Sequence, residues 1–305
     1  MKIIFMGTPE FAASSLDGLL KAGHDVCAVF TQPDKPVGRH RVITPPPVKE
    51  LAIQNNIEVF QPETLREGEA EKIIKEINPD AIAVVAYGKL IPESILQIPK
   101  FGCINVHGSI LPKYRGAAPI QWSVINGEKY AGVTTMYMDK GLDTGDIIYI
   151  EKTEIKEGET SEMLYERLAP MGADLLNKTL NDIEKGIAPR TKQNDEQSSY
   201  APMLSKEMAV LDFSKSAKEL SSLICGLNPW PIAYTTFNSK RLKVYTAICS
   251  EESGKIGEIL DSKILKIGCG EKSIVLLEVQ LEGSKRQSGE EFMRGQRLSK
   301  GMNLI

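Results

Sequence analysis

Residues 2–31, with the sequence KIIFMGTPEFAASSLDGLLKAGHDVCAVFT, decide the fold. The apolar run 2–6 predicts a buried strand, and Thr8 and Pro9 then suit the N-cap and the first position of a helix. Apolar residues recur at helical spacing after Pro9, and a second apolar run, 26–31, predicts another strand. A strand, a helix and a strand in this order predict an α/β domain with a parallel sheet and a right-handed crossover.

The loop after the first predicted strand does not carry a dinucleotide-binding fingerprint. That fingerprint, Gly-x-Gly-x-x-Gly, brings the backbone close to a pyrophosphate. Here only Gly7 is present, in the run Gly7-Thr-Pro-Glu-Phe11. We therefore expect a Rossmann-like domain whose ligand is not NAD, which weighs against a nicotinamide-dependent oxidoreductase.

The composition narrows the class of protein. The chain has 305 residues, 42% of them hydrophobic and 25% charged, which is ordinary for a globular protein of one large or two average domains. Five cysteines, never spaced Cys-x-x-Cys, and three scattered histidines predict neither a disulfide framework nor a metal site. The chain opens on a predicted strand and has no long apolar run, so we expect a cytoplasmic protein that does not bind a membrane.

Further predicted strands place polar residues at their ends. Asp80–Tyr87 is almost continuously apolar, as expected of a central parallel strand. Asn105 and His107 end a shorter strand. Another predicted strand, Gly132–Met138, leads into a loop rich in glycine and aspartate, 139–146. The first half of the chain therefore continues the α/β pattern of its opening.

The amino-acid composition of the chain changes after residue 188. Residues 189–206 are polar and contain two prolines, so we expect a linker between a domain over 1–188 and a second domain over 207–305. Short alternating segments follow at a spacing typical of a small β-barrel, and Ser288 with Glu291 predicts a capping box for a final helix. The predicted strands are Ala233–Phe237, Arg241–Ile248, Lys255–Leu260, Ile264–Ile267 and Ser273–Val279.

Asn105 and His107 form the first candidate catalytic pair. Residues two apart on a strand share a face, and the carboxyl ends of parallel strands are where open α/β sheets bind ligands. Asp143 follows another predicted strand, so a parallel sheet would bring it to the same edge. A carboxylate beside an imidazole orients the ring and favours its protonated form, and an amide N–H can stabilise a developing oxyanion. The structural alternatives are a hydrogen-bonded polar pair at a strand end and an Asx turn at Asp143.

No serine or cysteine stands beside this pair as an obvious nucleophile. Ser109 is close in sequence, but its hydroxyl is explained equally well by a turn and by a hydrogen bond to a ligand. Direct attack of a substrate amine on a carbonyl carbon therefore fits better than an acyl-enzyme mechanism.

The segment 32–49 is long, rich in proline and basic. It contains Lys35, Arg39 and Arg41, and basic residues on a semi-rigid loop suit phosphate groups, with a solvated charged loop as the alternative. The whole chain has a net charge of −3, whereas from residue 207 onward 14 Lys and Arg stand against 12 Asp and Glu, a net of +2. The charge of the second domain permits nucleic-acid binding without requiring it.

Several motifs together resemble the 10-formyltetrahydrofolate-dependent formyltransferase family, and the match covers essentially the whole chain. The motifs are Asn105-Val-His107-Gly-Ser109-Ile-Leu-Pro112 followed by Arg115-Gly116, Gly141-Leu-Asp143-Thr-Gly-Asp146, Gly7-Thr-Pro-Glu-Phe-Ala12, Gln32-Pro-Asp-Lys-Pro-Val-Gly-Arg39 and Asn228-Pro-Trp-Pro231. Their order and separation make this combination specific.

The resemblance implies an enzyme of translation initiation that transfers the formyl group of 10-formyltetrahydrofolate to the amino group of methionyl initiator tRNA. Asn105, His107 and Asp143 match the catalytic trio. Asn105 would donate a hydrogen bond to the oxyanion of a tetrahedral intermediate. His107 would take a proton from the amine or hold the charged intermediate, and Asp143 would orient His107. The resemblance implies no metal, and we expect a monomer.

Two binding regions are implied as well. The folate would contact Ser109, Ile110, Leu111 and Pro112, where Ile110 replaces the family's usual leucine. The turn with Tyr87, Gly88 and Leu90 would line the pterin pocket. The loop with Lys35, Arg39 and Arg41 would approach the tRNA acceptor stem, and the second domain would be an OB-like barrel that adds contacts to tRNA phosphates.

Other readings remain open at this point. A glycinamide ribonucleotide formyltransferase would stop after the first domain. The hydrolase domain of formyltetrahydrofolate dehydrogenase lacks an asparagine at the position of Asn105 and has a shorter first loop. The Arg39 loop and the Asn228–Pro231 motif favour tRNA over a sugar nucleotide as the acceptor. A non-catalytic RNA-binding protein built on an OB-like module would not need Asn105, His107 and Asp143 together.

Overall fold

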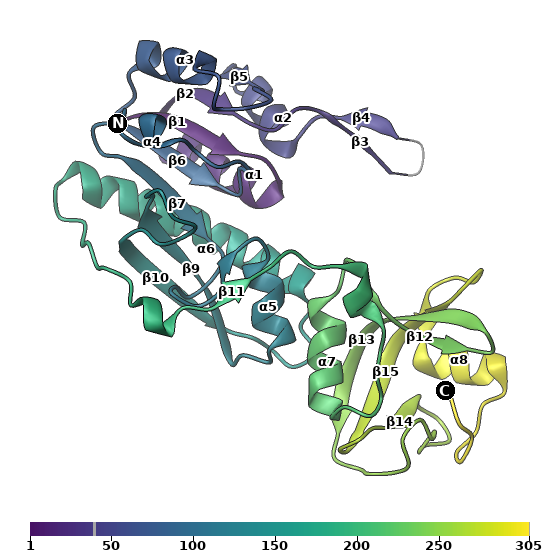
Figure 1. Cartoon of the computed structure of the whole chain (residues 1–305). Helices are drawn as coiled ribbons and strands as arrows, with labels where there is room; N and C mark the ends of the chain where they lie inside the picture. Colours follow the sequence, from purple (N-terminus) through teal and green to yellow (C-terminus); the bar gives the residue numbers. More distant parts are fainter. Residues whose placement is uncertain (39–40, 305) are drawn as a thin grey trace. The chain divides into compact units, whose positions relative to one another are not determined.

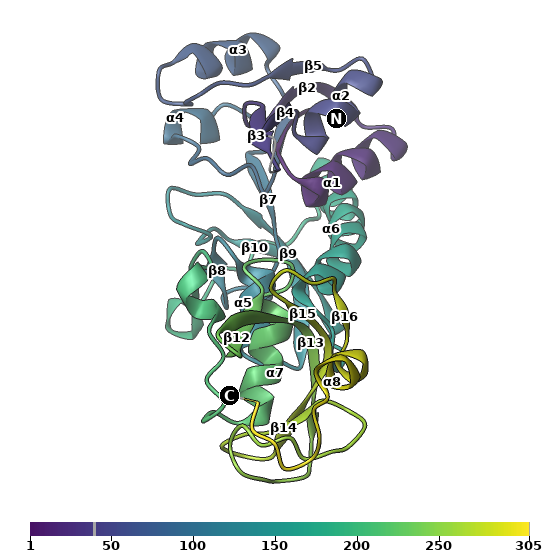
Figure 2. The same cartoon turned by 90° about the vertical axis from the view of Figure 1, so that its right-hand side faces the viewer.

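The structure of the chain, a computed structural model, describes residues 1–38 and 41–304 (Figures 1 and 2). These residues form two compact units, and each unit draws on more than one stretch of sequence. Unit 1 is Met1–Gly116, Gly132–Lys152 and Tyr165–Tyr200, and unit 2 is Ala117–Ala131, Thr153–Leu164 and Ala201–Ile305. Residues 117–131 and 153–164 thus group with the C-terminal residues, although they precede the predicted linker.

Unit 1 is built on a seven-stranded sheet in the order β10-β9-β7-β6-β1-β2-β5. The strands are β1 (Lys2–Gly7), β2 (Asp25–Phe30), β5 (Glu58–Phe60), β6 (Ala81–Val85), β7 (Cys103–His107), β9 (Tyr130–Tyr137) and β10 (Ile147–Glu154). The central strands pair in parallel, as predicted, but β9 runs antiparallel to β7. The sheet is therefore a mixed, Rossmann-like sheet and not a purely parallel one.

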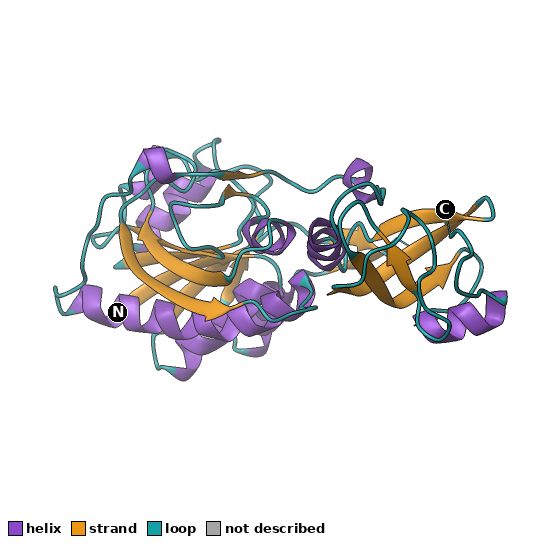
Figure 3. Ribbon diagram, turned by 90° about the horizontal axis from the view of Figure 1, so that it is seen from below, coloured by secondary structure: helices purple, strands orange, loops and turns teal. Residues whose placement is uncertain are grey.

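Helices lie on both sides of this sheet (Figure 3). They are α1 (Glu10–Lys21), α2 (Pro47–Gln54), α3 (Glu69–Ile77), α4 (Glu93–Leu96) and α6 (Ser161–Glu184). On β1, Ile4 and Met6 pack into a buried cluster with residues of α3 and α4. On β7, which β6 separates from β1 in the sheet, a Cβ on Gly172 of α6 would lie 3.1 Å from Val106, so α6 packs against the opposite face. This alternation directs Asn105 and His107 away from α6.

Two local predictions in unit 1 are wrong in detail. Thr8 is not the N-cap of α1, because Pro9 takes that position and the Thr8 hydroxyl donates instead to the Tyr87 carbonyl, at 3.1 Å. The segment 32–49 is not a structureless loop, since it contains an antiparallel hairpin of β3 (Lys35–Val37) and β4 (Val42–Thr44) before α2 begins.

Unit 2 is a small β domain with helices. Its sheet has the order β12-β13-β15-β14, with β16 also paired to β15, and its buried cluster includes Leu242, Val244 and Phe292. The elements are α5 (Pro119–Ile125), η2 (Lys206–Ala209), α7 (Ala217–Gly226), β12 (Ala233–Phe237), β13 (Lys240–Ser250), β14 (Lys266–Gly268), β15 (Ser273–Leu281), β16 (Gln287–Ser288) and α8 (Gly289–Gln296). The Ser288–Glu291 capping box is confirmed, whereas the strand predicted over Lys255–Leu260 is absent.

The chain between α6 and unit 2 has its own short elements. These are η1 (Asp195–Gln197) and β11 (Tyr200–Ala201), and β11 pairs with β8 (Arg115–Gly116). The Arg115 N–H donates to the Ser199 carbonyl at 2.9 Å. Residues expected to act as a linker are thus hydrogen-bonded to the segment that follows Asn105 and His107.

Candidate active site and nucleic-acid-binding surfaces

Asn105 and His107 stand on the last three residues of β7. Asn105 pairs with Met136 of β9 and His107 with Thr134, and both polar side chains are buried, with 9% and 6% of their surface exposed. Among residues 1–38 and 41–304, the Asn105 amide has no hydrogen-bond partner. Since a buried amide is normally paired within the protein, the Asn105 amide is available to a ligand.

The imidazole of His107 has a partner on each ring nitrogen. Its Nε2 lies 2.8 Å from the Tyr114 carbonyl oxygen, and its Nδ1 lies 3.6 Å from Oδ2 of Asp143. A carbonyl oxygen only accepts hydrogen bonds, so Nε2 carries the hydrogen and donates it. The ring is therefore held with Nδ1 facing the carboxylate, and a second proton on the ring would complete an ion pair with Asp143.

Asp143 reaches His107 by a different route from the predicted one. Because β9 is antiparallel to β7, the end of β9 lies beside the start of β7, and the sheet alone would place the following loop at the wrong edge. The loop folds back instead, and the Tyr137 N–H donates to the Asp146 carbonyl at 2.9 Å. Asp143 has a φ of 54°, and its Oδ2 accepts a hydrogen bond of 2.8 Å from the Gly116 N–H. Asp143 thus lies beside His107 as predicted, but the loop's own fold brings it there and not a shared edge of parallel strands.

The segment from Ser109 to Pro112 folds as a tight turn after β7. The Ser109 hydroxyl donates to the Lys113 carbonyl at 2.6 Å, and the Thr134 hydroxyl donates to the Ser109 carbonyl at 2.6 Å. Ser109 and Leu111 are buried, while Ile110 and Pro112 are half-buried. The side chains of this segment that a ligand can reach are thus those of Ile110 and Pro112.

The turn after β6 presents its backbone and not its aromatic ring. Tyr87 is 2% exposed within the core cluster, and burial raises the pKa of its phenol to about 12. Ala86, with φ 44°, and Gly88, with φ 80°, are exposed, and 69% of Leu90 is exposed. A ligand at this turn can therefore contact the backbone around Gly88 and the side chain of Leu90.

Two groups of this site were not found from the sequence. They are the Tyr114 carbonyl, which fixes the hydrogen on His107, and the Gly116 N–H, which holds the Asp143 carboxylate. Both are backbone groups, so no residue type marks them. The only signal is their position in or directly before the Arg115-Gly116 motif, which follows Pro112 at a short distance.

Comparison with known protein families shows to which family this chain belongs. A family described as "Formyl transferase" matches residues 1–180, and one described as "Formyl transferase, C-terminal domain" matches residues 203–297. The chain belongs to the formyl transferase family. It is therefore an enzyme with both domains of that family, and the first of them contains Asn105, His107 and Asp143.

Relatives of this formyl transferase share its full length. The methionyl-tRNA formyltransferase of Lachnospira eligens is 47% identical and covers 100% of this chain and 99% of its own. That of Clostridioides difficile is 48% identical and covers 100% of both chains. Among solved structures, the sugar 3N-formyl transferase WlaRD has a TM-score of 0.69 at 22% identity, over 93% of this chain and 99% of its own, which confirms the fold.

The basic hairpin of this formyl transferase is exposed. Lys35 and Arg41 are both exposed, whereas Arg39 lies outside the described residues. The hairpin base is tied down, because Asp34 accepts from Lys49 at 2.8 Å. Lys89 is close to it: the pKa of the Lys89 ammonium is lowered, first by burial and then by the charge of Lys35. Positive charge therefore extends from the hairpin to the turn that carries Leu90.

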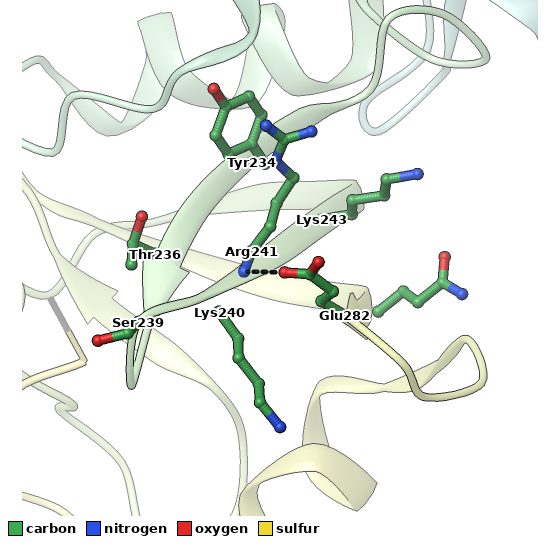
Figure 4. Close-up of a pocket in the computed structure, with 8 residues that line it drawn as sticks. Tyr234, Thr236, Ser239, Lys240, Arg241, Lys243 and Glu282 are labelled. Carbon is green, nitrogen blue, oxygen red and sulfur yellow. Dashed lines mark hydrogen bonds between the residues drawn. The ribbon is translucent and has the colours of Figure 1, made fainter.

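A second basic surface lies on the outer face of the unit 2 sheet (Figure 4). Here β13 and its neighbours line an open groove of about 680 Å³ with Lys240, Arg241 and Lys243. The Arg241 guanidinium lies 4.1 Å from the centre of the Tyr234 ring, and among the described residues none of these three side chains has an ion-pair partner. Unpaired cations beside an aromatic ring are suited to phosphates and bases.

Residues 1–38 and 41–304 lack two further features. No group of three or more His, Cys, Asp or Glu side chains is placed to hold a metal ion. No helix in these ranges is long and apolar enough to cross a membrane.

Proposed function

We propose that this formyl transferase transfers the formyl group of 10-formyltetrahydrofolate to the amino group of methionyl initiator tRNA. The observation that carries the proposal is the convergence of Asn105, His107 and Asp143 at the end of β7, in a chain 47–48% identical over its full length to methionyl-tRNA formyltransferases. We further propose that the enzyme acts as a monomer in the cytoplasm.

The reaction joins the amine nitrogen to the formyl carbon and breaks the bond between that carbon and N10 of the folate. The amine loses one proton and N10 gains one, so no proton is consumed overall. The Asn105 amide, which has no hydrogen-bond partner among the described residues, donates to the formyl oxygen as it becomes an oxyanion. A group fixed in this way by the strand needs no reorganisation during the reaction.

His107 acts as an electrostatic stabiliser in this proposal. A general base must turn a free ring nitrogen toward the amine. Here Nε2 is bonded to the Tyr114 carbonyl and Nδ1 faces Asp143. Neither nitrogen is free to turn toward the amine, which supports a ring that stays fixed beside Asp143 and, when it carries a second proton, offsets negative charge on the intermediate.

The folate is bound by exposed groups on the two turns. Ile110 and Pro112 on one side, and Gly88 and Leu90 on the other, offer apolar surface and backbone groups. Ser109, Leu111 and Tyr87 hold these turns from inside the fold, because their side chains are buried. The tRNA is bound by the hairpin with Lys35, Arg39 and Arg41, and by the groove on β13.

The test is a formylation assay with purified protein, 10-formyltetrahydrofolate and charged initiator tRNA. We expect transfer to methionyl-tRNA and none to the same tRNA with its methionine amine acetylated. His107→Gln keeps an N–H for the Tyr114 carbonyl but cannot hold a positive charge, so its kcat should fall about 10²-fold at unchanged tRNA affinity. Transfer to an amino sugar nucleotide in place of methionyl-tRNA would refute the proposed substrate.

A further inference from the structure

Gln193 is a buried residue in the segment that neither family match covers. The two matches end at residue 180 and begin at residue 203. Among residues 189–200, all of which the structure describes, only Gln193 is buried, with 7% of its surface exposed. A buried amide in an otherwise exposed polar run needs specific partners.

The Gln193 side chain joins two parts of the candidate active site. Its Nε2 donates to the carbonyls of Asp143 and Gly145, both at 2.8 Å. Its Oε1 accepts from Nε and Nη2 of Arg115, at 3.1 and 2.8 Å. The guanidinium only donates and the two carbonyls only accept, so the amide has one possible orientation.

These bonds act on a residue whose backbone is strained. Asp143 is a non-glycine residue with φ 54°, a conformation that costs about 1–2 kcal/mol. Gln193 holds the carbonyl of Asp143 itself and that of Gly145, on either side of Thr144. The Asp143 carboxylate is meanwhile held by the Gly116 N–H, next to Arg115 in the chain. Gln193 thus holds the backbone of Asp143, and it is also bonded to Arg115, the residue next to the Gly116 N–H that holds the carboxylate.

We infer that Gln193 is a positioning residue for the reaction, which holds the Asp143 loop so that the carboxylate stays beside His107. The inference rests on the proposed function for its kinetic consequences. It also gives a role to Arg115, which occurs in the sequence motif: its guanidinium is bonded to Gln193 and, at 2.7 Å, to Asp195.

The test compares two variants of Gln193 with a matched control. Gln193→Ala removes the four bonds to Asp143, Gly145 and Arg115, together with a longer contact of 3.9 Å from Nε2 to the Met136 sulfur. Gln193→Glu keeps an acceptor for Arg115 but removes both donors to the loop. Gln197→Ala changes an exposed glutamine of η1 in the same segment. We expect kcat to fall about 10²-fold in both Gln193 variants with KM for either substrate within about twofold, as for a misplaced catalytic group, and no change in the control.

A second readout does not need turnover. The Gly116 amide hydrogen is bonded to the Asp143 carboxylate, so its hydrogen exchange reports the position of that side chain. It should exchange faster in both Gln193 variants and remain unchanged in Gln197→Ala. Adding Asp143→Asn to Gln193→Ala should lower kcat no further than Asp143→Asn alone, because the two act on one group.

Two results would overturn the inference. One is a Gln193→Glu variant with wild-type kcat, because the donors to the loop would then be dispensable. The other is a Gly116 exchange rate that does not change in Gln193→Ala. If the parent protein itself fails to formylate methionyl-tRNA, the proposed function fails, and the Gly116 exchange rate alone then decides whether Gln193 holds the loop.

Discussion

Replacement of Gly145 by alanine tests whether the loop position matters for turnover. A Cβ at this position would lie 1.7 Å from the Tyr137 carbonyl oxygen and 2.8 Å from the Tyr137 carbonyl carbon. Both atoms belong to the backbone of β9, which is held in the sheet. The loop therefore has to move, and it has to move by more than 1 Å to reach an ordinary contact distance.

The expected cost has two parts. A shift of this size breaks the bond between Gln193 and the Gly145 carbonyl and displaces the Asp143 carboxylate two residues away. Misplacing a catalytic group by about 1 Å costs about 10²-fold in rate, and the crowding costs about 1–3 kcal/mol in the free energy of unfolding. We expect Gly145→Ala to show both losses while the KM for tRNA remains unchanged.

The assay pairs steady-state formylation with urea unfolding. Gly295→Ala is the control, because a Cβ there meets nothing within 4 Å and an alanine near the end of α8 should stabilise the protein by about 0.5–1 kcal/mol. If folded Gly145→Ala protein turned over within twofold of wild type, the geometry of the Asp143 loop would not control the reaction, and the roles given to Asp143 and Gln193 would be wrong.

Three further changes test other parts of the molecule. Asn105→Ala should lower kcat about 10²-fold and change the free energy of unfolding by less than about 1 kcal/mol, since the amide has no hydrogen-bond partner in the part of the chain that the structure describes. A kcat within twofold of wild type would contradict its role. Arg241→Ala should weaken tRNA binding and reduce the slope of log affinity against log salt by about 1; an unchanged slope would exclude a phosphate contact. Burial raises the pKa of the Cys103 thiol from 9.0 to about 12. The unfolded chain therefore releases that proton first, and stability that is complete below pH 9 should fall as the pH rises toward 12. Urea midpoints at pH 8 and pH 10.5 measure this loss, and Cys103→Ala should make it smaller.

Patterns within a single element were predictable from the sequence. β12 has the bounds expected from its apolar alternation, and the Ser288 capping box is confirmed, because each depends on neighbouring residues only. The prediction for Thr8 failed because its hydroxyl found a more distant partner, the Tyr87 carbonyl. The hairpin of β3 and β4 was not predicted either, because its sequence is rich in prolines and charged residues and has no apolar alternation.

Relations between elements were harder to predict. A strand pattern has no direction, so nothing in Gly132–Met138 indicated that β9 would run antiparallel to β7. Asn105 and His107 share a face because they share a strand, and this was predictable. The contact of Asp143 with His107 depends on how the loop folds back, and that is fixed by Gly116 and Gln193 through bonds that no spacing rule describes.

Gln193 limits where the chain can be cut to make a catalytic fragment. A fragment that ends at residue 188 would retain every residue of the catalytic trio and every motif of the first family match. It would lack Gln193 and Ser199, whose bonds to Arg115, Tyr114 and the Asp143 loop would be lost. An isolated catalytic fragment, or a chimera that borrows the C-terminal domain of another enzyme, should therefore keep its native sequence through Tyr200.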